Sequence, residues 1–75
     1  MLNNDEVLQL AKAAVEAGKS KTSFVNEMSA KADKYDTNKA YETIKASYRD
    51  MATKTYDTAR AQFDQKKAQD LQKEI

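Results

Sequence analysis

Side chains that can recognise a ligand by hydrogen bonding gather in two stretches of the chain, residues 19–22 and 34–43. Amide, ammonium and hydroxyl groups of this kind can read DNA, because Asn bonds adenine, Lys reaches guanine and Thr contacts the thymine methyl group. Lys, Ser and Thr also bind phosphate oxygens. The candidates of these types are Lys19, Ser20, Lys21, Thr22, Lys34, Asn38, Lys39 and Thr43.

Catalytic and metal-binding chemistry finds little support in the composition. The chain has no His and no Cys, which removes the usual acid–base group, the thiol nucleophile and the ligands that zinc prefers. Its 12 acidic residues are scattered among 13 basic ones, whereas a catalytic carboxylate pair needs a concave, water-poor site. We therefore expect no enzymatic activity, no metal site and no cofactor.

Charge gives the two candidate stretches a modest basic character. The whole chain carries a formal net charge of only +1, which weighs against a role in binding nucleic acid. Residues 19–49 hold seven basic and four acidic side chains, so this part alone is net +3. No apolar run approaches the ~18 residues of a membrane span, and we expect a cytoplasmic protein that does not contact membranes.

The elements that must position these side chains are predicted to be helices. With no Pro, one Gly and no alternating β-type run, the chain is expected to be all-α, with three helices. The first should span about residues 5–17. Asn3 or Asn4 can cap it, Asn3 with Glu6 has the spacing of a capping box, and Gly18 ends it. The second is expected over about 22–33, and the third runs from Asn38 to the end of the chain.

The third helix is long enough to need covering by another chain. About 36 residues at 1.5 Å each give a length of ~55 Å, and the two short helices are expected to cover only Tyr41, Ile44 and Tyr48. We expect the remaining stripe to bind a second copy of the chain or a helix of another protein. A bend near Thr53–Thr58 would instead let the tail fold back as a fourth helix. The stripe consists of Ala52, Tyr56, Ala59 and Phe63.

The order of the helices resembles that of a known class of DNA-binding domain. The segments "SKTSFVNEM" and "TNKAYETIK" resemble the second helix and the recognition helix in the trihelical core of winged-helix-type, helix-turn-helix DNA-binding domains, over about residues 7–48. The resemblance implies that Asn38, Lys39 and Thr43 face the major groove, while Lys34 and residues 19–22 contact phosphates. The family's turn carries Gly and an apolar residue where this chain has Lys34 and Tyr35, and no strands follow to make a wing.

Two functions follow from this reading. The first is a small DNA-binding accessory or regulatory protein of phage or plasmid type, acting as a dimer, with a helix-turn-helix head at residues 1–48. Residues 49–75 would continue the long helix and serve oligomerisation or partner binding. The alternative is a non-enzymatic helical interaction module, such as an assembly subunit, adaptor or inhibitor, with no role in binding nucleic acid.

Overall fold

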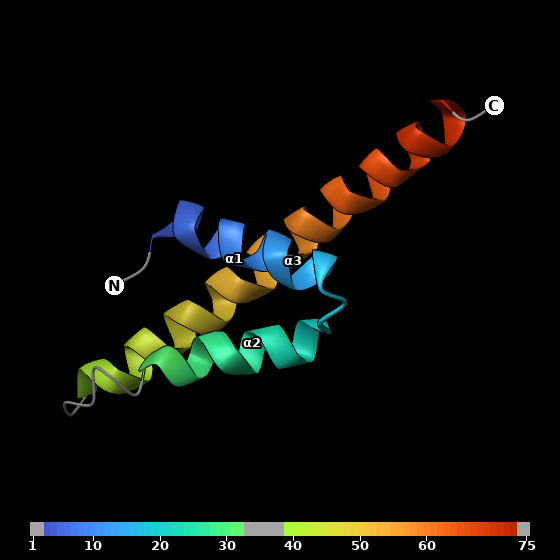
Figure 1. The fold of residues 1–75 in the computed structure, drawn as a ribbon. Helices are drawn as coiled ribbons and strands as arrows, with labels where there is room; N and C mark the ends of the chain where they lie inside the picture. The colour runs from blue at the N-terminus through green and yellow to red at the C-terminus, as the bar shows by residue number, and fades with distance from the viewer. Residues whose placement is uncertain (1–2, 33–38, 74–75) are drawn as a thin grey trace.

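Three helices make up the fold (Figure 1). The computed structural model describes residues 3–32 and 39–73. Helix α1 spans Asn4–Glu16, α2 spans Lys21–Ala30 and α3 spans Lys39–Lys73. Neither described range contains a strand, so the predicted all-α class with three helices is confirmed. The helix ends lie close to those predicted, although the start expected at Asn38 lies outside the described residues.

Local hydrogen bonds explain where α1 begins and ends. The Asn3 side chain accepts a hydrogen bond from the Glu6 backbone N–H at 2.9 Å, so Asn3 is the one of the two candidate residues that caps the first turn. At the other end Gly18 adopts a φ of +78°, in the left-handed region that L side chains rarely enter. This turn lets the Gly18 N–H donate to the Val15 carbonyl at 3.1 Å and the Lys19 N–H donate to the Ala14 carbonyl at 2.9 Å. The pair of bonds closes the helix as a Schellman motif.

Helix α2 follows after a short connection. Ser20 caps it, because its hydroxyl accepts a hydrogen bond from the Ser23 backbone N–H at 3.2 Å. The helix then runs alongside the first half of α3 in the opposite direction, so the two form a helical hairpin (Figure 1). The end of α2 and the start of α3 thus lie at the same end of the molecule.

The core lies where α1 and α2 pack against α3. Both short helices make their main contacts with α3, and α1 crosses its middle (Figure 1). Tyr48, Met28 and Val7 are the largest fully buried side chains, one from each helix. The other buried apolar residues are Ala11, Ala14, Val15, Phe24, Ala32, Ala52, Tyr56 and Ala59.

The expectation that much of the α3 stripe stays bare is wrong. Ala52, Tyr56 and Ala59 are 0%, 7% and 2% exposed, and Phe63 is partly buried against the same core. The helices are as short as predicted, but α1 crosses α3 at this stripe instead of lying beside its N-terminal end. Two short helices that pack at different positions along the axis of a long helix cover more of it than two that pack side by side. Tyr48 is buried and Ile44 is partly buried, as expected, whereas the Tyr41 side chain lies outside the described set.

The last turns of α3 leave the body of the protein. Every side chain from Asp64 to Lys73 is exposed, and this segment projects beyond α1 and α2 as a single helix, here named the α3 arm (Figure 1). The long dimension of 57 Å, against 18 and 13 Å, reflects this extension. No described helix carries the long uncharged apolar stretch that crossing a bilayer requires.

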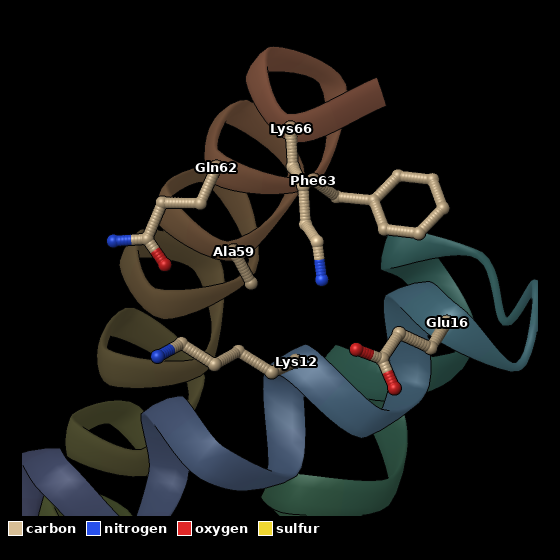
Figure 2. A pocket seen from close by; sticks show the side chains of 6 residues that line it. All are labelled: Lys12, Glu16, Ala59, Gln62, Phe63 and Lys66. Carbon is tan, nitrogen blue, oxygen red and sulfur yellow. The ribbon is translucent and has the colours of Figure 1, made fainter. Parts of the chain in front are cut away.

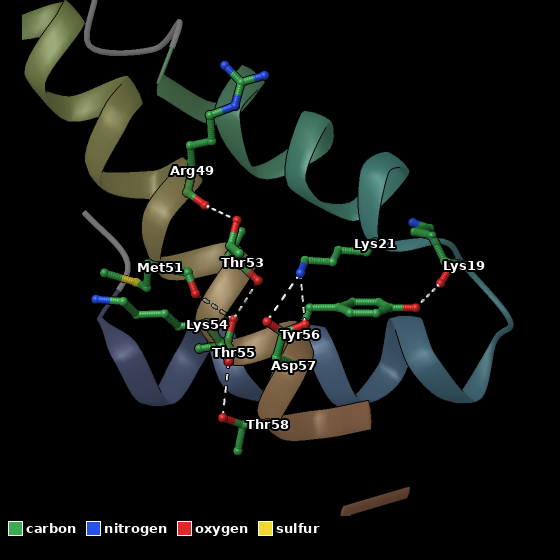
Figure 3. Close-up of polar contacts among 11 residues, drawn as sticks. Lys19, Lys21, Arg49, Met51, Thr53, Lys54, Thr55, Tyr56, Asp57 and Thr58 are labelled. Atoms are coloured by element: carbon green, nitrogen blue, oxygen red, sulfur yellow. Dashed lines mark hydrogen bonds and ion pairs between the residues drawn. The ribbon is translucent and has the colours of Figure 1, made fainter. Parts of the chain in front are cut away.

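The suggested bend near Thr53–Thr58 does not fold the tail back. Helix α3 is one continuous helix from Lys39 to Lys73. Thr53, Thr55 and Thr58 each donate a side-chain hydrogen bond to the carbonyl four residues earlier, at 2.8–3.0 Å (Figure 3). Such bonds satisfy the threonine hydroxyls within the helix itself.

Candidate interaction surfaces

The two lysines expected to hold DNA phosphates in the connection between α1 and α2 are engaged within the chain. Lys19 Nζ lies 2.7 Å from a carboxylate oxygen of Glu27. Lys21 Nζ lies 2.9 Å from a carboxylate oxygen of Asp57 (Figure 3). Both pairs are exposed to solvent, so each contributes little to stability. Their charges are nevertheless balanced locally, which weakens the phosphate-binding site that the sequence predicts.

The hydroxyl candidates beside these lysines divide into two roles. Ser20 is the N-cap of α2, so its oxygen already serves the backbone of the helix. Thr22 is exposed on the first turn of α2. The structure therefore leaves Thr22 accessible and gives Ser20 a structural function.

Only some of the candidate DNA-binding residues on the predicted recognition helix are among the described residues. Lys34 and Asn38 lie outside the described residues, and Lys39 is the first residue of α3. Thr43 is exposed near the start of α3, as a DNA-reading residue would be. A helix-turn-helix unit places its two helices at about 90–120° to each other. The antiparallel packing of α2 on α3 does not confirm a head of that kind (Figure 1).

The predicted partner-binding stripe is an internal contact. The Phe24 and Tyr56 rings lie 5.9 Å apart between centroids with a tilt of 36°. The Tyr56 hydroxyl donates a hydrogen bond of 2.7 Å to the Lys19 carbonyl oxygen (Figure 3). These contacts hold the connection between α1 and α2 against α3. Tyr56 thus binds its own chain, and it is not a surface for another protein.

An open groove between α1 and α2 is the apolar surface that sequence reasoning missed. It encloses about 340 Å³ and exists because the two helices pack on α3 more than on each other. Leu10, on its α1 side, is 41% exposed, which makes it the one large exposed apolar residue in the described three-helix body. We call this feature the α1–α2 groove; it is lined by Leu10, Ala13, Ala14, Ala17, Lys19, Phe24, Glu27, Met28 and Lys31.

The spacing of residues on α1 carried a signal for this groove. The buried face of α1 contains Val7, Ala11, Ala14 and Val15, and Leu10 lies outside it. Leu10, Ala13 and Ala17 follow each other at intervals of three and four residues, which places them on a second face of α1.

Two further hollows flank the crossing of α1 and α3. One, of about 250 Å³, lies where the α3 arm leaves the body, and Figure 2 shows Lys12 and Glu16 of α1 opposite Gln62 and Lys66 of α3. Lys67 Nζ lies 5.0 Å from the centre of the half-buried Phe63 ring, so a cation shields part of that ring. The other, of about 470 Å³, contains Leu8 and Met51 among polar side chains. Both have charged residues of either sign among their lining side chains.

Catalytic and metal-binding arrangements are not found among the described residues. No group of three acidic, His or Cys side chains lies close enough in that part of the chain to hold a metal ion. Ser29 is 3% exposed, and its hydroxyl has no hydrogen-bond partner within the described ranges. Without a neighbouring base, the hydroxyl of a buried serine is not activated as a nucleophile.

Comparison with models of known protein families, with curated proteins and with solved structures gives no match to this chain.

Proposed function

We propose that this chain is a non-enzymatic helical interaction protein that binds a helix in the α1–α2 groove. The observation that carries the proposal is the groove itself, which is open and apolar and has Leu10 exposed on its α1 side. An exposed apolar surface with a polar rim is characteristic of an interaction site. A groove between two helices suits the apolar face of a third, a common mode of peptide recognition.

The walls of the groove support this function. Ala13 and Ala17 on α1 are small, so the backbone of a bound helix can approach closely. Phe24 and Met28 on α2 are 3% and 1% exposed, so they close the floor of the groove from the core side and leave Leu10 as its large accessible apolar side chain. Lys19, Glu27 and Lys31 form a charged rim that can select among partners.

A matched pair of substitutions tests the proposal. Ala13→Glu places a charge in the groove, while Ala68→Glu places the same charge on the exposed α3 arm. Both positions are exposed in helices, and Glu is a good helix former, so both variants should fold. In cells that encode the protein, the tagged parent and Ala68→Glu should enrich the same partner and Ala13→Glu should lose it. Equal capture by all three forms would contradict the proposal.

DNA binding is the second candidate, and one observation favours it. Helix α3 begins at Lys39 and exposes Thr43 near its start, where a recognition helix presents its reading side chains. Under this proposal Lys39→Ala weakens binding to duplex DNA at low salt, while Lys73→Ala at the far end of α3 does not. If Lys39 contacts phosphate, the loss of affinity is similar on all DNA sequences. The slope of log affinity against log salt concentration then falls by about one. Absence of any binding by the parent at low salt rejects this candidate.

A further inference from the structure

We propose that the helix occupying the α1–α2 groove is α1 of a second copy of this chain, in a symmetric antiparallel dimer. This inference rests on the proposed function, because it names the partner of the same groove. It differs from the dimer that the sequence predicts, which used the stripe now found in the core. The two copies present the same surface to each other, as the two-fold symmetry of a dimer requires.

The shape of α1 is complementary to itself in the antiparallel direction. Leu10 and Ala17 lie at equal distances in sequence from the midpoint between Ala13 and Ala14. When two α1 helices pack antiparallel about that midpoint, each Leu10 comes opposite Ala17 of the second copy. A large side chain then meets a small one twice, and Ala13 sits at the centre of the contact.

The charges at the two ends of α1 are also complementary. Asp5 and Glu6 occupy its first turn, and neither makes an ion pair with another described residue. Lys19 lies just beyond the other end, on the rim of the groove. In the antiparallel pair, Glu6 of one copy reaches the connection that carries Lys19 of the other. Lys19 donates two hydrogen bonds to Glu27, at 2.9 and 2.7 Å, and an ammonium group has three N–H donors.

Sedimentation equilibrium of the full chain tests whether the dimer forms. A contact of one helix with one groove is small, so we expect a dissociation constant on the order of 100 µM, in the range of weak complexes below about 1,200 Å². Ala13→Glu should be monomeric at every concentration, because it places two like charges at the symmetric centre. Ala68→Glu should dimerise like the parent. A parent that stays monomeric at about 1 mM overturns the inference.

A charge exchange tests the antiparallel arrangement. Glu6→Lys places two lysines together at both ends of the contact, and Lys19→Glu places two carboxylates together. Each variant alone should dimerise about tenfold more weakly than the parent, since two exposed pairs change sign. An equimolar mixture of the two variants restores both opposite-charge pairs and should regain the affinity of the parent. Circular dichroism of each variant checks that the helices remain folded.

The outcomes separate this inference from the proposed function. If the mixture does not regain affinity, the antiparallel arrangement is wrong. If a dimer survives Ala13→Glu, the copies associate through another surface and the inference is wrong. If the parent is monomeric but captures a different protein in an Ala13-dependent manner, the groove function stands and its occupant is not a second copy. If neither dimer nor Ala13-dependent capture is found, both proposals fail.

Discussion

The Tyr56 hydroxyl donates a 2.7 Å hydrogen bond to the backbone carbonyl of Lys19, across 37 positions of sequence. This bond joins the middle of α3 to the connection between α1 and α2 (Figure 3). The neighbouring Lys21–Asp57 pair, at 2.9 Å, makes a second link between the same two parts of the chain. Together with the packing of the core, the bond from Tyr56 sets where along α3 the connection between α1 and α2 lies.

The hydrogen bond from Tyr56 should contribute measurably to stability. Tyr56→Phe keeps the ring packed near Phe24 and leaves the Lys19 carbonyl without its donor. We expect the free energy of unfolding to fall by about 0.5–1.5 kcal/mol, the usual net value of one hydrogen bond. Tyr56→Ala should lower it by about 3–5 kcal/mol, because the ring contact is lost and a cavity remains. Urea denaturation measures both values. A free energy of unfolding that is the same in Tyr56→Phe as in the parent would show that the bond does not contribute to stability.

The helices themselves were accessible to sequence reasoning because their signals are local. The cap at Asn3 and the stop at Gly18 each depend on residues within one or two turns. The location of α1 on α3 depends on contacts such as the bond between Tyr56 and Lys19, which no local pattern reveals. An apolar stripe shows that a helix face is covered, but it does not show which segment covers it. For this reason Ala52 was assigned to a partner and is found in the core.

The candidate site was harder to predict for a related reason. A groove is the space between two elements, so the residues of α1 alone do not define it. Leu10 is an apolar residue away from the buried face of α1, and that alone does not show what it contacts. Lysines 19 and 21 were read as phosphate ligands because their carboxylate partners, Glu27 and Asp57, are 8 and 36 positions away in sequence.

Alanines at the centre of the core should tolerate no enlargement. Ala52 is 0% exposed between α3 and the helices that cover it. Ala52→Leu should lower the free energy of unfolding by about 1–3 kcal/mol, because additional methylene groups in a packed core force its neighbours to move. Ala61→Leu makes the same change at an exposed position of the same helix, and we expect a change within about 0.5 kcal/mol there. Equal effects at the two positions would contradict the position of Ala52 in the core.

Gly18 should be required for its backbone conformation alone. Its φ is +78°, and a Cβ added there meets no atom within 4 Å, so a larger residue causes strain without a clash. Gly18→Ala should therefore lower the free energy of unfolding by about 1–2 kcal/mol, which is the penalty for an L residue in the left-handed region. A synthetic chain with D-alanine at this position should avoid that penalty, since D residues favour positive φ. Thermal unfolding of the two forms compares them, and an equal loss in both would point to side-chain crowding.

The α3 arm should contribute almost nothing to the stability of the body. Every described side chain from Asp64 to Lys73 is exposed, and an isolated helix shorter than about 12–15 residues is marginal in water. A chain shortened to residues 1–67 retains Lys67 over Phe63 and should unfold within about 0.5 kcal/mol of the parent. Shortening to residues 1–58 also removes Ala59, which is 2% exposed, and Phe63, and it should destabilise the body by several kcal/mol. If the first truncation destabilises the protein as much as the second, the arm makes contacts that stabilise the fold, contrary to its exposed position beyond α1 and α2.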